Sequence, residues 1–257
     1  MITGLSTACF YPMPTEKALE KVGELGFKTS EIFFNSPCEL NTDFLKELKA
    51  IKDYYNIDIE TVHPLASFIE SYMFFSEYER RFYDSLEIYK KYFEAANQLG
   101  AKAVVMHGAK STVNTNFDMY CERFSKLINA GESYGVTVAH ENVVKSVGES
   151  PSALQKMRDT IGYSFKIVFD IKQSLRSGYD PLEFAQSLGD IMVQIHISDH
   201  NSTRDCIPPG EGVFDFKGLC DIMSGHGYSG NYIIELYRSN FKNDNQLTGA
   251  YEYLKNI

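Results

Sequence analysis

The sequence predicts an α/β fold and, within that class, a closed (β/α)₈ barrel that forms a single domain over residues 1–257. Short runs of β-branched and aromatic residues alternate with longer stretches of helical periodicity, as in chains of βα units around a parallel sheet. Eight runs and eight stretches can be counted, and no Pro-, Gly- or Ser-rich linker divides them. A length of 257 residues is also usual for one such barrel. An open doubly wound sheet is the alternative, although nothing like G-x-G-x-x-G follows the first strand.

Each predicted strand is a short apolar run bounded by residues that are typical of turns. In chain order, the strands are expected at Ile2–Thr7, Thr29–Phe34, Ile59–His63, Ala103–His107, Thr137–Glu141, Lys166–Asp170, Val193–Ile197 and Tyr232–Leu236.

The helices between these strands begin and end at recognisable signals. Gly26 and Gly100 each follow a helical stretch and precede a strand, which is the usual place of a glycine that ends a helix. Ser150 and Asp180 each stand before a proline, so that a capping residue precedes a proline at the first helical position. The helices are expected near residues 15–25, 42–55, 77–99, 117–134, 151–160, 181–188, 215–226 and 245–256.

The composition limits the classes of partner that the chain is expected to bind and the compartment in which it is expected to occur. A formal net charge of −9, with no Lys- or Arg-rich run, argues against nucleic acid as a partner. Five scattered cysteines without a CxxC pair are typical of a reducing cytoplasm. Neither a signal peptide nor an apolar run of about 20 residues is present, so we expect a cytoplasmic protein that does not bind membranes.

Six of the predicted strands carry, at or next to their last position, a polar residue that can bind a metal. In parallel strands of a closed barrel these ends converge on one rim, where such barrels carry their active sites. A charged residue that closes an apolar strand is costly to bury unless it is paired or bound to a cation. The six are His63, His107, Glu141, Asp170, His196 and Glu235, of which the last four are predicted to surround one divalent metal ion.

Several of these residues also have a possible structural role. Taken singly, His63 or His107 could be a hydrogen-bonded structural histidine, Glu141 could pair with a lysine, and Asp170 could cap the next helix. Strand alternation turns His140 away from the pocket, so it is predicted to be structural.

Two loops of the predicted rim add further candidates. The aromatic loop of residues 64–77, with Phe68, Tyr72, Phe74 and Phe75, could form a lid over a small ligand or a contact in a homo-oligomer. In the loop of residues 199–212, Arg204 could hold a substrate oxygen or phosphate, or could simply be solvated.

Short motifs, in this order and at these strand positions, resemble those of the xylose isomerase-like TIM barrel superfamily. They are EN at Glu141–Asn142, FD…SG at Phe169–Gly178, HISD at His196–Asp199, PPGEG at Pro208–Gly212 and IIEL at Ile233–Leu236. That grouping includes the sugar phosphate isomerases and epimerases, ketose 3-epimerases, inosose dehydratase and endonucleases of the endonuclease IV type.

The resemblance implies that Glu141, Asp170, His196 and Glu235 bind one divalent ion. Mn²⁺, Mg²⁺ or Co²⁺ is expected in preference to Zn²⁺. The resemblance also implies that the catalytic residues Glu141 and Glu235 exchange a proton with a carbohydrate substrate through a metal-stabilised enediolate. The expected function is therefore a metal-dependent isomerase or epimerase of a sugar or sugar phosphate. The alternatives are a lyase like inosose dehydratase, a metal-dependent phosphodiesterase, and a barrel that binds a sugar without catalysis.

Departures from the endonuclease pattern weigh against the phosphodiesterase. That pattern has a histidine where this chain has Gln173, and a D-x-H triplet where this chain reads Arg204-Asp205-Cys206. Three zinc ions are therefore not expected, although a two-metal site with His63, His107 and a bridging Glu141 stays open. With one metal, the predicted substrate-binding residues are His63, His107, Gln173 and Arg204.

Overall fold

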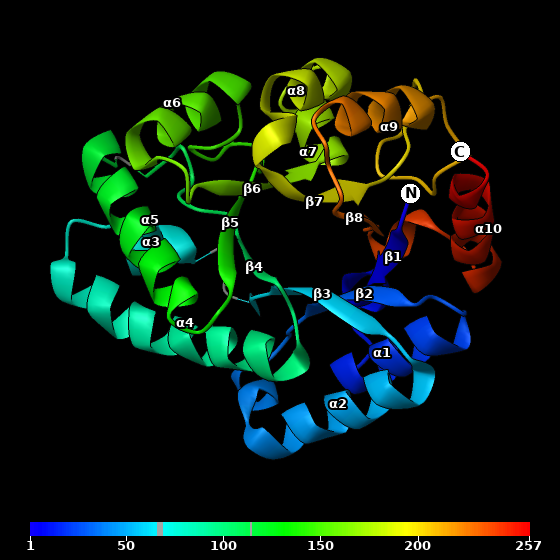
Figure 1. The fold of residues 1–257 in the computed structure, drawn as a ribbon, viewed down its shortest axis with the longest axis horizontal. Coiled ribbons are helices and arrows are strands. Elements are labelled where there is room, and N and C mark those ends of the chain that lie inside the picture. The colour runs from blue at the N-terminus through cyan, green and yellow to red at the C-terminus, as the bar shows by residue number, and fades with distance from the viewer. Residues whose placement is uncertain (66–68, 114) are drawn as a thin grey trace.

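The eight strands of the protein form one closed parallel barrel, which confirms the predicted fold class. The computed structural model describes residues 1–65, 69–113 and 115–257. The strands follow one another around the barrel in chain order, and the last pairs with the first, so the sheet has no free edge (Figure 1). They are β1 (Thr3–Ser6), β2 (Thr29–Phe33), β3 (Asp58–His63), β4 (Ala103–Met106), β5 (Thr137–Glu141), β6 (Lys166–Asp170), β7 (Met192–Ile197) and β8 (Asn231–Ile234).

Helices surround the barrel, and each long one agrees with a stretch of helical periodicity in the sequence (Figure 1). The caps are those that the sequence indicated, since Ser150 and Asp180 accept hydrogen bonds from backbone N–H groups of the helices they precede. The long helices are α1 (Thr15–Glu24), α2 (Thr42–Tyr55), α4 (Glu79–Leu99), α5 (Phe117–Glu132), α6 (Pro151–Ile161), α8 (Pro181–Leu188), α9 (Phe216–Gly225) and α10 (Asp244–Lys255).

Two short helices that the sequence did not predict flank the rim. They are α3 (Glu70–Phe74) and α7 (Ile171–Arg176), which are too short to show a helical period. Helix α7 begins directly after β6 because the Asp170 carboxylate accepts a hydrogen bond from the backbone N–H of Gln173, at 3.1 Å. Asp170 therefore ends a strand and caps a helix at once.

The aromatic loop of residues 64–77 does not form the lid or oligomer contact that the sequence suggested for Phe74 and Phe75. Both side chains are fully buried, because Phe74 packs edge-on against Tyr89 and Phe75 stacks on Tyr120. Tyr72 alone of the described aromatics there is exposed, and Phe68 lies outside the described residues. The rings of Phe74 and Phe75 thus attach α3 to the core.

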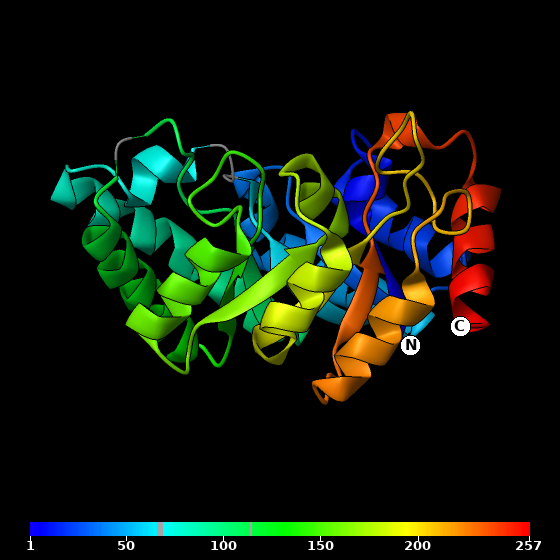
Figure 2. The same cartoon turned by 90° about the horizontal axis from the view of Figure 1, so that it is seen from above.

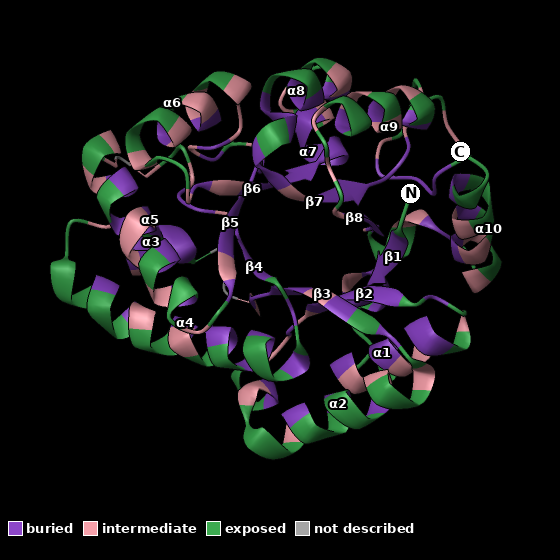
Figure 3. Ribbon diagram, viewed as in Figure 1, coloured by how far each residue is buried: buried purple, intermediate pink, exposed green. Residues whose placement is uncertain are grey.

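The apolar core has two parts. The larger part lies between the strands and the inner faces of the helices, whose outer faces are exposed (Figure 3). The smaller part fills the inside of the barrel with the side chains of Val105, Ala139, Val168 and Val193. Seen from the side, the strands lead to one rim, where the loop after β7 stands above the barrel (Figure 2). No helix in the described part of the chain is long and apolar enough to cross a membrane.

Candidate functional site

The structure brings the four predicted metal ligands together at the carboxyl ends of β5 to β8. Nδ1 of His196 lies 3.5 Å from a carboxylate oxygen of Glu141, 3.7 Å from Asp170 and 3.5 Å from Glu235. One potential ligand atom from each of the four residues lies within 4.8 Å of the others. Glu141, Asp170 and His196 are buried, whereas Glu235 is partly exposed toward a cavity. Such a set of one nitrogen and three carboxylate oxygens suits a divalent ion.

Nδ1 of His196, which is buried in this cluster, has no hydrogen-bond partner among the described residues. Nε2 of His196 lies 2.9 Å from Glu31, whose carboxylate only accepts, so the Nε2–H of His196 donates to it. A neutral His196 would therefore turn the lone pair of Nδ1 toward three carboxylates, an arrangement that a cation stabilises. Burial opposes the charged imidazole, yet the surrounding carboxylates of Glu31 and Glu235 raise the pKa of His196 well above its usual value. The atoms present fit a divalent ion.

Glu31, in the middle of β2, orients His196 from beneath. It is fully buried and accepts hydrogen bonds from Ser6 (3.0 Å), Thr61 (2.8 Å), Gln194 (2.8 Å) and His196. Burial raises the pKa of Glu31, but His196 and the other donors more than offset it and lower the pKa to about 2. A carboxylate behind a ligating histidine fixes its tautomer and ring orientation. Sequence reasoning missed Glu31, although a single charge inside an uncharged strand could have indicated it.

A second cluster joins His63 and His107 to the other side of Glu141. Nε2 of His107 lies 2.7 Å from Oε2 of Glu141 and 2.9 Å from Nε2 of His63. Nδ1 of His63 lies 3.2 Å from the carbonyl of Pro64, so the Nδ1–H donates there and Nε2 can accept. These three residues form a second group with the spacing of a metal site. Burial raises the pKa of Glu141, but His107, together with His196 and His63, lowers it well below its usual value.

A cavity of about 550 Å³ opens above both clusters. Three of the predicted substrate-binding residues, His63, His107 and Gln173, line it together with both predicted catalytic carboxylates, Glu141 and Glu235. Phe33, Tyr11 and Tyr237 provide aromatic walls, and Phe33 stacks on the His63 ring with centroids 4.5 Å apart. The volume is that of a small-molecule pocket.

Lys172 is a further residue of this cavity that sequence reasoning missed. Its ammonium donates hydrogen bonds to Oδ2 of Asp170 and Oε2 of Glu235, and its side chain is only 4% exposed. Burial opposes the charge, but Asp170 and Glu235 raise the pKa of Lys172 well above its usual value. A lysine two positions after the strand-end aspartate was the available signal.

Comparison with known proteins agrees with this architecture. Residues 19–257 match the family described as xylose isomerase-like TIM barrel. The chain belongs to this family. Fructoselysine 3-epimerase of Escherichia coli O157:H7 is 24% identical over 253 residues, which cover 92% of this chain and 90% of that protein. An uncharacterised protein of Methanocaldococcus jannaschii is 26% identical over 246 residues, which cover 90% of this chain and 82% of that protein. The crystal structure of a D-tagatose 3-epimerase-like protein superposes with a TM-score of 0.82 at 24% identity, covering 100% of this chain and 96% of that one.

Two motifs that carried the family resemblance have clear structural roles in this xylose isomerase-like barrel. In EN, the Asn142 side chain accepts from the backbone N–H of Asp170 at 2.6 Å and donates to its carbonyl at 3.0 Å, which ties β5 to β6. In HISD, the Asp199 carboxylate accepts four backbone N–H groups, of His200, Gly210, Gly212 and Phe214. It thereby fixes the PPGEG turn, and a Cβ at Gly212 would lie 2.2 Å from the carboxylate.

Cys206 belongs to neither group of candidate metal ligands in the described part of the chain. Its Sγ donates to the Glu235 carbonyl at 3.9 Å, and burial raises the pKa of the thiol to about 11. His140 is structural, as predicted: it is fully buried outside the barrel sheet and lies 2.6 Å from the Tyr120 hydroxyl.

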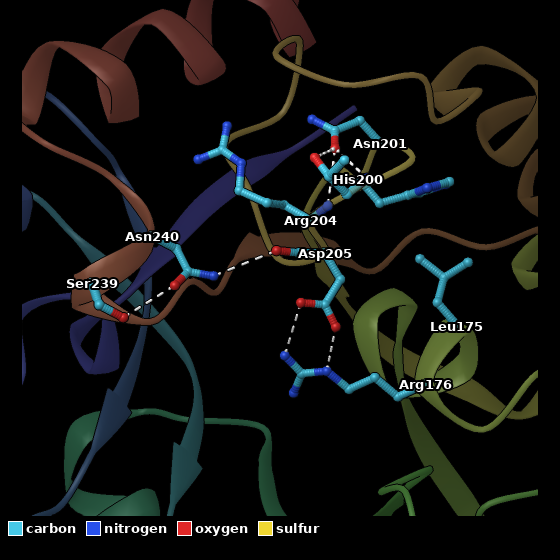
Figure 4. A pocket seen from close by; sticks show the side chains of 9 residues that line it. Leu175, Arg176, His200, Asn201, Arg204, Asp205, Ser239 and Asn240 are labelled. Atoms are coloured by element: carbon cyan, nitrogen blue, oxygen red, sulfur yellow. Dashed lines mark hydrogen bonds and ion pairs between the residues drawn. The ribbon is translucent and has the colours of Figure 1, made fainter.

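The structure does not place Arg204 in the cavity above the candidate metal ligands. Arg204 is exposed and lines a neighbouring pocket of about 540 Å³, between the loop after β7 and residues 239–240 (Figure 4). In that pocket Asp205 pairs with Arg176 at 2.5 Å, while the Arg204 side chain points away from that pair (Figure 4). Ser239 lines both pockets, so the two adjoin.

Proposed function

We propose that this chain is a metal-dependent sugar epimerase or isomerase that moves a proton between Glu141 and Glu235. The observation that carries the proposal is that both carboxylates line one small cavity and lie 3.5 Å from Nδ1 of His196, which has no hydrogen-bond partner among the described residues. The relationship to fructoselysine 3-epimerase supports a carbohydrate substrate.

Glu141, Asp170, His196 and Glu235 would hold the divalent ion. When bound, this ion would polarise a carbonyl and an adjacent hydroxyl of the substrate and stabilise the charge of an enediolate. His63, His107 and Gln173 are positioned to contact substrate oxygens. The amide oxygen of Gln173 accepts from the backbone N–H of Val144 at 3.1 Å, so the side-chain amide is oriented and its NH₂ group donates.

In the proposed reaction one carboxylate removes the proton from the carbon next to the carbonyl, and the C–H electron pair becomes part of the enediolate. The other carboxylate returns a proton to the opposite face of that carbon, which inverts its configuration. The aromatic walls of Phe33, Tyr11 and Tyr237 would limit access of water to the enediolate.

Arg204 fits a different part of a substrate. Because the pocket that it lines adjoins the cavity at Ser239, an anionic group such as a phosphate at the far end of the sugar would meet it there. Arg204→Ala should therefore raise KM for phosphorylated sugars without lowering kcat, and it should leave KM for neutral sugars unchanged.

The experiment is hydrogen exchange from D₂O into a panel of ketoses and ketose phosphates, with metal content measured for each variant. Glu141→Gln and Glu235→Gln should each lose exchange with the epimer whose proton that carboxylate removes, while exposed Glu211→Gln should behave like the wild type. Unchanged exchange in both variants would overturn the roles assigned to them. Release of water with an unsaturated product would instead identify a dehydratase, and cleavage of abasic DNA would identify a phosphodiesterase.

A further inference from the structure

We infer that the Lys172 ammonium competes with the divalent ion for Asp170 and Glu235, so that the ion binds only when the lysine leaves both carboxylates. This inference rests on the metal site of the proposed function. The inference concerns the competition between the lysine and the ion for the site. A measurement of metal affinity tests it without any substrate.

The position of Lys172 follows from the junction between β6 and α7. Asp170 ends the strand and caps the helix, which fixes the backbone of residues 171–173 directly behind the site. The Lys172 side chain turns back into the site rather than out to solvent, and its salt bridges are to Asp170 and Glu235. Its ammonium also lies 5.9 Å from the ring centroid of Tyr237, which forms part of the cavity wall. Lys172 is therefore built into the site.

The ammonium and the ion need the same oxygen atoms. Lys172 donates to Oδ2 of Asp170 and Oε2 of Glu235, and these same atoms face Nδ1 of His196 at 3.7 and 3.5 Å. Oδ1 of Asp170 is already occupied, because it accepts from the backbone N–H of Gln173. A divalent ion binds carboxylate oxygens at about 2.0–2.6 Å, so an ammonium bonded to both oxygens takes up its place. An ammonium and a divalent ion that bind the same oxygen atoms also repel each other strongly in a buried site.

The charge balance explains why a lysine is tolerated here. Glu141, Asp170 and Glu235 bring three negative charges into a buried cluster, which would repel one another in the ion-free protein. His107 lies against Glu141, and Lys172 lies between the other two, so each carboxylate has a positively polarised partner before any ion arrives. Lys172 thus stabilises the ion-free barrel and weakens its affinity for the ion.

The test is isothermal titration of the ion-free full-length protein with Mn²⁺, Co²⁺ and Mg²⁺ at one pH. Lys172→Met and Lys172→Gln should bind the ion about tenfold or more tightly than the wild type, the factor that one lost charge-assisted hydrogen bond corresponds to. Lys172→Gln keeps the polar shape and serves if the Met variant fails to fold. The control is Lys102→Met, which removes a lysine paired with Glu60 at 2.8 Å at the opposite end of the barrel and should leave affinity unchanged.

A thermal-shift measurement gives an independent readout. Without the ion, the Lys172 variants should melt below the wild type, and saturating ion should raise their Tm by more than it raises that of the wild type. Equal affinity in wild type and variants would overturn the competition while leaving the metal site in place. Weaker binding in the variants would overturn it too, since Lys172 would then support the ion. Binding in none of the proteins would overturn both this inference and the proposed metal site.

Discussion

Replacement of Glu31 by glutamine tests whether the buried network beneath the site controls the affinity for the proposed metal ion. Oε2 of Glu31 receives three donors, from Thr61, Gln194 and His196, whereas Oε1 accepts from the Ser6 hydroxyl alone within the described part of the chain. A glutamine can place its amide oxygen toward those three donors and its NH₂ group toward the Ser6 hydroxyl, which can accept. Glu31→Gln therefore keeps the shape and most hydrogen bonds of the network, and it removes one negative charge 2.9 Å from Nε2 of His196.

The magnitude follows from the role of that charge. Loss of a carboxylate that orients a ligating histidine typically lowers metal affinity by about 10- to 100-fold, or about 1.4–2.7 kcal/mol. We expect the upper part of this range, because Glu31 and His196 are both fully buried and solvent does not screen their interaction. The pKa of His196 should also fall, since Glu31 is the foremost of the carboxylates that raise it.

The assay is calorimetric titration with Mn²⁺ and Co²⁺ at pH 7, alongside thermal unfolding of the ion-free protein. Glu60→Gln, which removes a carboxylate at the opposite end of the barrel, is the matched control. An affinity in Glu31→Gln within twofold of the wild type, with a normally folded protein, would refute the reasoning. Tighter binding would show that the Glu31 charge opposes the ion instead.

Two further predictions concern stability. Asn142→Leu leaves the backbone N–H and carbonyl of buried Asp170 without their side-chain partners, so urea unfolding should show a loss of about 2–6 kcal/mol; a loss below about 1 kcal/mol would contradict this role. Burial lowers the pKa of His140 to about 4, so between pH 6.5 and 4 only the unfolded chain takes up this proton, and the stabilisation is lost as the pH falls. The difference in unfolding free energy between wild type and His140→Gln should therefore shrink by about 2 kcal/mol from pH 7 to pH 5, and a constant difference would show that His140 is not the titrating group.

The strands and the rim residues were predictable because each depends on a short-range pattern. An apolar run that ends in a charged residue is visible in the sequence, and closure of a parallel barrel then brings those ends together without further information. The positions of Asp170, His196 and Glu235 at the rim were predicted in this way.

The supporting residues depend on packing that no short pattern records. Glu31 bonds to Gln194 and His196, more than 160 residues away, through the inside of the barrel. Lys172 lies on a helix of six residues that exists because Asp170 caps it. Arg204 lies beside a second pocket because Asp199 fixes the course of its loop, and Phe74 and Phe75 are turned inward by rings on α4 and α5.

The network around Glu31 also means that neither half of the barrel could carry the site alone. All four candidate ligands come from residues 137–257, so a fragment that begins with β5 and runs to Ile257 would contain the complete ligand set. The groups that aim the His196 ring, Ser6, Glu31 and Thr61, come from β1, β2 and β3. In an isolated C-terminal half, or in a chimera joined to a foreign N-terminal half, His196 would still be present. Its imidazole ring would no longer be held in the orientation that the site needs. Recombination between related barrels should therefore preserve this centre only when the crossover carries both halves of the network from one parent.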